Sequence, residues 1–184
     1  MTTRPPPPRS VSRPALAAVT SAGARSPAPI PKRLSGKRVT LCVTGSVAAY
    51  KAALLVRSLL KDGATVEVVL SRSAREFVGA ATFSGLTGKR VFTEMFDGEE
   101  PGEVHVKLAK ESDLVVIAPA TADVLSRLAS GRADDLIAAL ALSAACPILV
   151  APAMHPNMWS HPATTRNVQT LHTDRRVRFV GPVV

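Results

Sequence analysis

The chain has 184 residues, of which 46% are apolar and 20% charged, enough apolar material for one compact domain. Its formal net charge of +9 is concentrated in the first 38 residues, which hold eight Lys or Arg and no Asp or Glu. Because the remaining residues are nearly neutral, the composition argues against a nucleic-acid partner for the folded part. Apolar stretches are too short to span a bilayer, so no membrane partner is expected either.

Residues 1–35 contain eight of the fifteen prolines and are otherwise rich in Ser, Ala and Arg. This composition predicts a disordered leader, with an organelle transit peptide as the alternative. The ordered domain is expected over residues 36–184. Cys42 and Cys146 lie in apolar runs without metal-ligand spacing, which predicts no metal site and reduced thiols in the cytoplasm.

Short β-rich runs alternate with helical periodicities along the rest of the chain. Strands are expected at 38–44, 65–71, 113–119, 146–153 and 177–184. Helices are expected at 47–62, around 73–80, at 82–88 (ending at Gly85 or Gly88), 121–130, 133–145 and 161–174. A short helix or a turn is expected at 105–112, and an exposed loop at 96–103. The alternation predicts a single α/β domain with a Rossmann-like (flavodoxin-like) doubly wound parallel sheet of five or six strands.

Ligands of such sheets bind beyond the carboxyl ends of the strands. The turns expected there consist largely of small and hydroxyl residues, at Thr44–Val47, Leu70–Ser73, Ala118–Thr121 and Ala151–Met154. The first turn leads directly into a helix, whose free N–H groups favour an anion. An ordinary helix N-cap at Ser46 is the alternative interpretation of that turn.

Five segments occur in the order seen in a known family. They are GSVAAYK (45–51), HVKLA (105–109), DLVVIAPATAD (113–123), GRADDL (131–136) and PAMHPNMW (152–159). Together they resemble the flavoprotein decarboxylases that act on cysteine carboxylates, which include phosphopantothenoylcysteine decarboxylase and the lantibiotic peptidyl-cysteine decarboxylases. The resemblance covers roughly residues 37–184. It implies bound FMN, homotrimers or multiples of trimers with the flavin at a subunit interface, and in many bacterial members a fused phosphopantothenate–cysteine ligase.

The resemblance also implies a role for each matched residue. The phosphate-side positions are Gly45, Ser46 and Val47 in one turn, and Ser71 and Ser73 in a second. The positions facing the isoalloxazine ring are Pro119, Ala120, Thr121, Ala122 and Asp123. The catalytic residue is His105. The substrate-binding residues are Met154 and His155, the second of which stands where the family commonly has Asn.

The implied reaction converts 4′-phosphopantothenoylcysteine to 4′-phosphopantetheine in coenzyme A biosynthesis. Oxidation of the cysteine Cβ by FMN gives a thioaldehyde, which accepts the electrons left by carbon dioxide. An imidazole suits the proton transfer near neutral pH. Pantothenate-type members carry a cysteine in a flap beyond the position of Val184, so the sequence predicts either an oxidised or enethiol product or a longer chain.

Three other functions fit parts of this pattern. A peptidyl-cysteine decarboxylase would make a C-terminal enethiol and needs no flap. A flavin prenyltransferase would need a different phosphate-binding set. A regulatory subunit that keeps the flavin fold is disfavoured by the intact His105. Asp134 and Asp135 are expected as charges at the start of a helix, and the GRADDL resemblance implies a role at a subunit contact or the flavin edge as the alternative. Trp159 is expected as a packing residue, with contact to the ligand as the alternative.

Overall fold

The computed structural model describes residues 32–96 and 103–181. Residues 1–31 of the expected leader, 97–102 of the expected loop and 182–184 of the expected last strand lie outside the described residues. Within the described part, every helix is too short or too polar to cross a bilayer.

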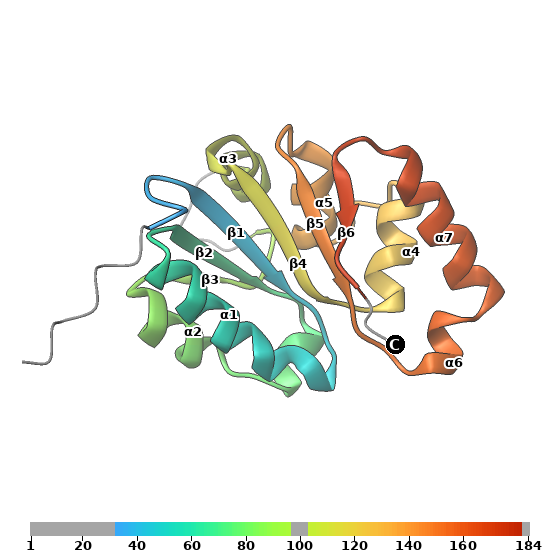
Figure 1. Cartoon of the computed structure of the whole chain (residues 1–184), viewed down its shortest axis with the longest axis horizontal. Coiled ribbons are helices and arrows are strands. Elements are labelled where there is room, and N and C mark those ends of the chain that lie inside the picture. Colours follow the sequence, from blue (N-terminus) through green and yellow to red (C-terminus); the bar gives the residue numbers. More distant parts are fainter. Residues whose placement is uncertain (1–31, 97–102, 182–184) are drawn as a thin grey trace, which may run out of the picture. The chain divides into compact units, whose positions relative to one another are not determined.

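Six parallel strands form one sheet in the order β3-β2-β1-β4-β5-β6 (Figure 1). They are β1 (Arg38–Val43), β2 (Thr65–Leu70), β3 (Val91–Phe92), β4 (Leu114–Ala120), β5 (Ile148–Pro152) and β6 (Val177–Phe179). This is the strand order of the Rossmann fold, and without the two-residue edge strand β3 it is that of flavodoxin. The predicted doubly wound parallel sheet is therefore confirmed.

Helices cover both faces of the sheet. They are η1 (Val47–Ala49), α1 (Tyr50–Lys61), η2 (Ser73–Glu76), α2 (Ala80–Thr87), α3 (Val104–Glu111), α4 (Ala122–Ser130), α5 (Leu136–Ser143), α6 (Pro156–Trp159) and α7 (Pro162–Thr173). Helices α1 and α2 pack over one face, and α3, α4, α5 and α7 pack over the other (Figure 1). Each side of the sheet therefore has its own hydrophobic core.

The two cores are built from side chains that alternate along the strands. Phe83, Leu41 and Leu70 are fully buried on the α1–α2 side, and Ile117 and Leu140 on the other. Full burial of such a side chain stabilises the fold by about 1.5–3 kcal/mol. Helix α5 is buried from Leu136 to Ala141, which explains its uniformly apolar sequence.

Two elements were not predicted, and one was predicted in the wrong form. Strand β3 has two residues and helix α6 has four, both too short to show a periodic pattern. The helix expected around 73–80 is only the single 3-10 turn η2. Of the two predicted ends of helix α2, Gly85 and Gly88, the structure has Gly88. Its φ of 68° lies in the left-handed region, which glycine adopts readily.

Asp174 and Arg176 clamp the connection between α7 and β6. Arg176 Nη2 and Nε donate to the Asp174 carboxylate at 2.6 and 3.1 Å, and Nη1 donates to the Ala144 carbonyl at 2.7 Å. The hydrogen bonds from Arg176 lower the pKa of Asp174 below its ordinary value. A lowered folded-state pKa adds stability that is present above about pH 4 and is lost as the pH falls through that pKa.

We therefore expect Asp174→Asn to make the free energy of unfolding less dependent on pH in the acid range. At pH 7 the variant should lose about 0.5–1 kcal/mol, because the pair is partly exposed and screened by solvent. Between pH 4 and pH 2 its unfolding midpoint should fall less steeply than that of the unmodified chain. Thermal unfolding followed by circular dichroism at several pH values measures both effects, and parallel curves would contradict the expectation.

Candidate functional site

Strands β1 and β4 are neighbours at the point where the chain reverses its winding direction, and a threonine joins their carboxyl ends. Thr44 Oγ1 donates to the Pro119 carbonyl at 2.6 Å and accepts from the Thr121 N–H at 3.1 Å. Thr44 is buried, so these bonds satisfy a polar group that would otherwise be destabilising. The strand ends that border the candidate site are thus held rigidly together.

The turns that follow β1 and β2 pack closely against each other. A Cβ built on Gly45 would lie 2.4 Å from Ser73 Oγ and 2.5 Å from Ser73 Cβ, so only glycine fits at this position. Ser71 Oγ lies 3.2 Å from Ser73 Oγ and accepts from the Ala74 N–H at 3.1 Å. Ser46 caps η1 by accepting from the Ala48 N–H, as the N-cap interpretation predicted. Two hydroxyl-bearing turns therefore meet at one edge of the sheet.

A cleft of about 720 Å³, which we call the β2–α5 cleft, opens beside these turns. It is lined by residues of the turn after β2, the segment after β3, the start of α4 and the start of α5. Four of the predicted cofactor-binding residues line it, namely Ser71, Ser73, Thr121 and Asp123.

An ion cluster forms one wall of the β2–α5 cleft. Arg127 Nη2 lies 3.0 Å from Asp123, and its Nη1 lies 2.8 Å from Asp135 and 3.3 Å from Asp134. Partial burial lowers the pKa of Arg127, but the hydrogen bond and the charges of the three carboxylates outweigh burial and raise it overall. Asp135 also caps α5, accepting from the Ala138 N–H at 2.8 Å. The cluster therefore ties the start of α5 to α4.

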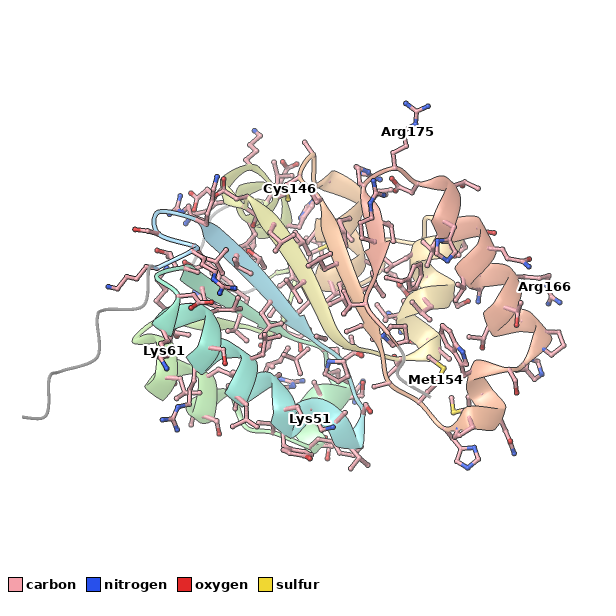
Figure 2. All side chains as sticks on the ribbon, viewed as in Figure 1. Lys51, Lys61, Cys146, Met154, Arg166 and Arg175 are labelled. Atoms are coloured by element: carbon pink, nitrogen blue, oxygen red, sulfur yellow. The ribbon has the colours of Figure 1, made fainter. Side chains whose placement is uncertain are left out.

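A second hollow of about 780 Å³, the β1–β5 groove, lies at the same end of the strands. It is lined by residues of η1, the start of α1, the end of β5 and α6. Ser46 and Val47 of the predicted cofactor turn line it together with Met154 and His155 of the predicted substrate motif. Figure 2 shows Met154 and Lys51 at this end of the sheet and Cys146 at the opposite end. The half-buried Trp159 also lines the groove.

The structure thus divides the predicted site between two hollows. Neither hollow is lined by Gly45 after β1, by Pro119 and Ala120 at the end of β4, or by Ala122 at the start of α4. Within one described chain, His105 also lines neither hollow. It is the second residue of α3 and is half-buried, and its Nδ1 is buried without a hydrogen-bond partner among the described residues.

Several residues of these walls were given no individual role in the prediction. Arg127 is one of them, and Thr44 and Arg72 were predicted only as members of the turns at the strand ends. Asp134 and Asp135, which also line the cleft, were predicted as charges at a helix start, with a subunit or flavin-edge role as the alternative. A local signal existed for Arg127, because it follows Asp123 by four residues on one helix face. The approach of Arg127 to Asp134 and Asp135 depends on how α4 and α5 pack, which no local spacing indicates.

A parallel sheet of this order, with hydroxyl-rich turns at its winding reversal, defines a Rossmann-like α/β protein with a candidate nucleotide site. The sequence profile of the family described as Flavoprotein matches residues 28–184. The chain belongs to the Flavoprotein family.

Individual relatives agree with this assignment. The coenzyme A biosynthesis bifunctional protein CoaBC of Mycobacterium tuberculosis is 53% identical over 135 residues, 73% of this chain and 32% of the relative. The structure of the FMN-dependent cysteine decarboxylase SpaF is 35% identical, with a TM-score of 0.71 over 79% of this chain and 85% of SpaF. A PPC decarboxylase mutant complexed with pantothenoylaminoethenethiol is 26% identical, with a TM-score of 0.67 over 80% and 82% of the two chains. The chain spans about a third of the length of the curated relatives it matches.

Proposed function

We propose that this chain is an FMN-dependent decarboxylase that acts on 4′-phosphopantothenoylcysteine in coenzyme A biosynthesis. The observation that carries the proposal is the β1–β5 groove, in which Ser46 and Val47 lie beside Met154 and His155, more than a hundred residues further along the chain. One turn of the proposed cofactor site and the proposed substrate motif therefore share one surface. The likeness to CoaBC supports a place in coenzyme A biosynthesis, and the likeness to the PPC decarboxylase supports the choice of substrate.

The residues at the strand ends fit a flavin mononucleotide. Gly45 leaves room for Ser73, and the hydroxyls of Ser71 and Ser73 can donate to a phosphate. Ser46 and Val47 would hold the same phosphate from the other turn, since they begin the helical segment after β1. The small residues from Pro119 to Asp123 would allow the isoalloxazine ring to approach the end of β4 closely.

When bound, FMN would supply a two-electron oxidation of the substrate Cβ, which provides a sink for the electron pair left by carbon dioxide, and would return the two electrons where the product is the saturated thiol. The chain's own residues orient the substrate and move its proton. His105 is the proposed proton acceptor, because an imidazole exchanges protons readily near neutral pH. Its unpartnered Nδ1 is consistent with a residue that awaits a partner outside its own chain.

His155 is proposed to hold the substrate carboxylate in place of the asparagine common in the family. Its Nδ1 accepts from the Asn157 N–H at 3.2 Å, so in the neutral ring the proton lies on Nε2. The side chain is exposed and borders the β1–β5 groove, which leaves Nε2 free to donate to a carboxylate. The helix-capping bond of His155 therefore orients the ring for the role that an asparagine amide fills elsewhere.

We further propose that a homotrimer, or a multiple of trimers, completes the site between subunits. Val47, Tyr50 and Leu54 form an exposed apolar stripe along η1 and α1, with 76%, 57% and 59% of their surfaces exposed. A contact there would cover this stripe beside the groove and bring the partner's residues to it. Light scattering of the purified protein measures the assembly. Co-expressing inactive His105→Asn and Gly45→Ala chains should restore part of the activity if His105 serves a neighbouring subunit's cofactor.

Cys42 and Cys146 are both unpaired, which supports a cytoplasmic location. Burial raises the pKa of the Cys42 thiol, so this thiol stays protonated and inert in the core.

The function is tested with the purified chain, added FMN and synthetic 4′-phosphopantothenoylcysteine. Mass spectrometry should detect a product formed only when FMN is present, lighter by one carbon dioxide if the two electrons are returned to the product, or by one carbon dioxide and two hydrogens if the enethiol is released. Absence of such a product from a yellow, folded protein would contradict the proposal.

A second candidate is a peptidyl-cysteine decarboxylase, because the structures of the FMN-dependent cysteine decarboxylases SpaF and TvaF are 35% and 33% identical to this chain. A peptide ending in cysteine belongs in the same mass-spectrometric experiment. Decarboxylation of the peptide alone would favour this second function.

A further inference from the structure

The β2–α5 cleft is lined by two cationic side chains among its described residues, Arg72 and Arg127. They differ in their surroundings. Arg127 lies within 3.3 Å of three carboxylates, those of Asp123, Asp134 and Asp135. Its charge is therefore already compensated by the protein, and an anionic ligand would have to compete with three fixed anions for it.

Arg72 has no such partner. It stands in the turn between Ser71 and Ser73, is exposed, and forms no ion pair with any residue in the described ranges. Arg75, three residues later, is paired instead with Glu94 at 3.2 Å. Arg72 is thus the cleft cation whose guanidinium is free to bind a ligand.

The other charged side chains of the cleft are mostly acidic, so the positive charge of Arg72 matters for binding an anion. Five acidic residues also line it, at Glu76, Glu94, Asp123, Asp134 and Asp135. A phosphate group entering this cleft meets more negative than positive charge on the lining. The serine hydroxyls beside Arg72 donate hydrogen bonds but carry no charge. A guanidinium supplies both charge and paired donors that match phosphate oxygens.

We propose that Arg72 is a specificity-determining residue that makes the site select the phosphorylated flavin, FMN, over riboflavin. The inference rests on the proposed function, since it takes the flavin site as given. The physical cause of the selection is that Arg72 compensates the charge of the phosphate, which the acidic side chains of the cleft would otherwise repel. Riboflavin lacks the phosphate, so its binding does not depend on this charge.

The test compares the binding of two flavins by flavin-free protein. FMN and riboflavin are titrated separately into the unmodified chain and into Arg72→Gln, with quenching of flavin fluorescence as the readout. Arg72→Gln should weaken FMN binding by about tenfold or more, the usual effect of losing a charged hydrogen-bond partner, and leave riboflavin binding unchanged. Raising the salt concentration should weaken FMN binding less in the variant than in the unmodified chain.

Two further variants control the result. Arg75→Gln removes a neighbouring exposed cation that is already paired, and it should leave the preference for FMN intact. Arg72→Lys keeps the charge and should retain part of the preference. The unfolding midpoint of Arg72→Gln should match that of the unmodified chain, because Arg72 makes no described bond that holds the fold.

The outcomes separate this inference from the proposed function. If the unmodified chain binds neither flavin, the proposed function fails and the inference fails with it. If the unmodified chain binds FMN and Arg72→Gln binds it equally well, the inference alone is overturned. Equal weakening of FMN and riboflavin also overturns it, because a structural disturbance of the turn would have that effect.

Discussion

Replacing His105 by Asn is expected to lower the rate of decarboxylation by about 10²–10⁴-fold, the usual contribution of a positioned general base. An amide cannot take up a proton near neutral pH, whereas an imidazole does. FMN should still bind, because the turns proposed to hold its phosphate, which contain Ser46 and Ser73, are unchanged in the variant. The measurement is single-turnover product formation, followed by mass spectrometry at saturating substrate.

The fold of the variant should be intact. Nδ1 of His105 makes no hydrogen bond within the described residues, so its replacement breaks none. His172→Asn is the matched control, since His172 is an exposed helix residue whose ring lies 4.8 Å from that of Phe179. It should retain full activity. If the unmodified chain and His105→Asn are equally inactive while both bind FMN, the chain is better described as a flavin-fold regulatory subunit.

Replacing Gly45 by Ala is expected to weaken FMN binding by more than tenfold and to destabilise the fold by about 1–3 kcal/mol, as overpacking of a tight contact usually does. The new Cβ would lie 2.4 Å from Ser73 Oγ and 3.0 Å from the Ser73 carbonyl carbon. The turns after β1 and β2 must then move apart, and both are proposed to hold the phosphate. Urea unfolding and FMN titration measure the two effects.

Two variants show whether the contact itself is the cause. Gly85→Ala is the matched control, because a Cβ on Gly85 meets nothing within 4 Å inside α2. It should stabilise the fold by about 0.5–1 kcal/mol. Adding Ser73→Gly to Gly45→Ala removes the hydroxyl and Cβ of the clash, and should recover part of the lost stability without restoring FMN affinity. Unchanged stability in Gly45→Ala would show that the turns are less tightly packed than described.

The order of the elements could be read from the sequence because its signals are local. Alternating β-rich and helical segments set the fold class, and Gly131 ends α4 where the sequence placed a helix end. Thr121 and Asp135 cap the helices they precede, since a cap depends on neighbours three residues away. Short elements escaped prediction because β3 and α6 are shorter than the periodic patterns that identify strands and helices.

The sequence alone determined the family resemblance, the strand ends and the residue types that gather there. Only the tertiary structure decided which of them meet. It placed Ser46 with Met154 in one groove and Ser73 with Asp123 in another, left His105 outside both, and surrounded Arg127 with three carboxylates while leaving Arg72 unpaired. The physical reason is that contacts between distant residues follow from strand order and helix packing, which emerge when the whole chain buries its apolar surface.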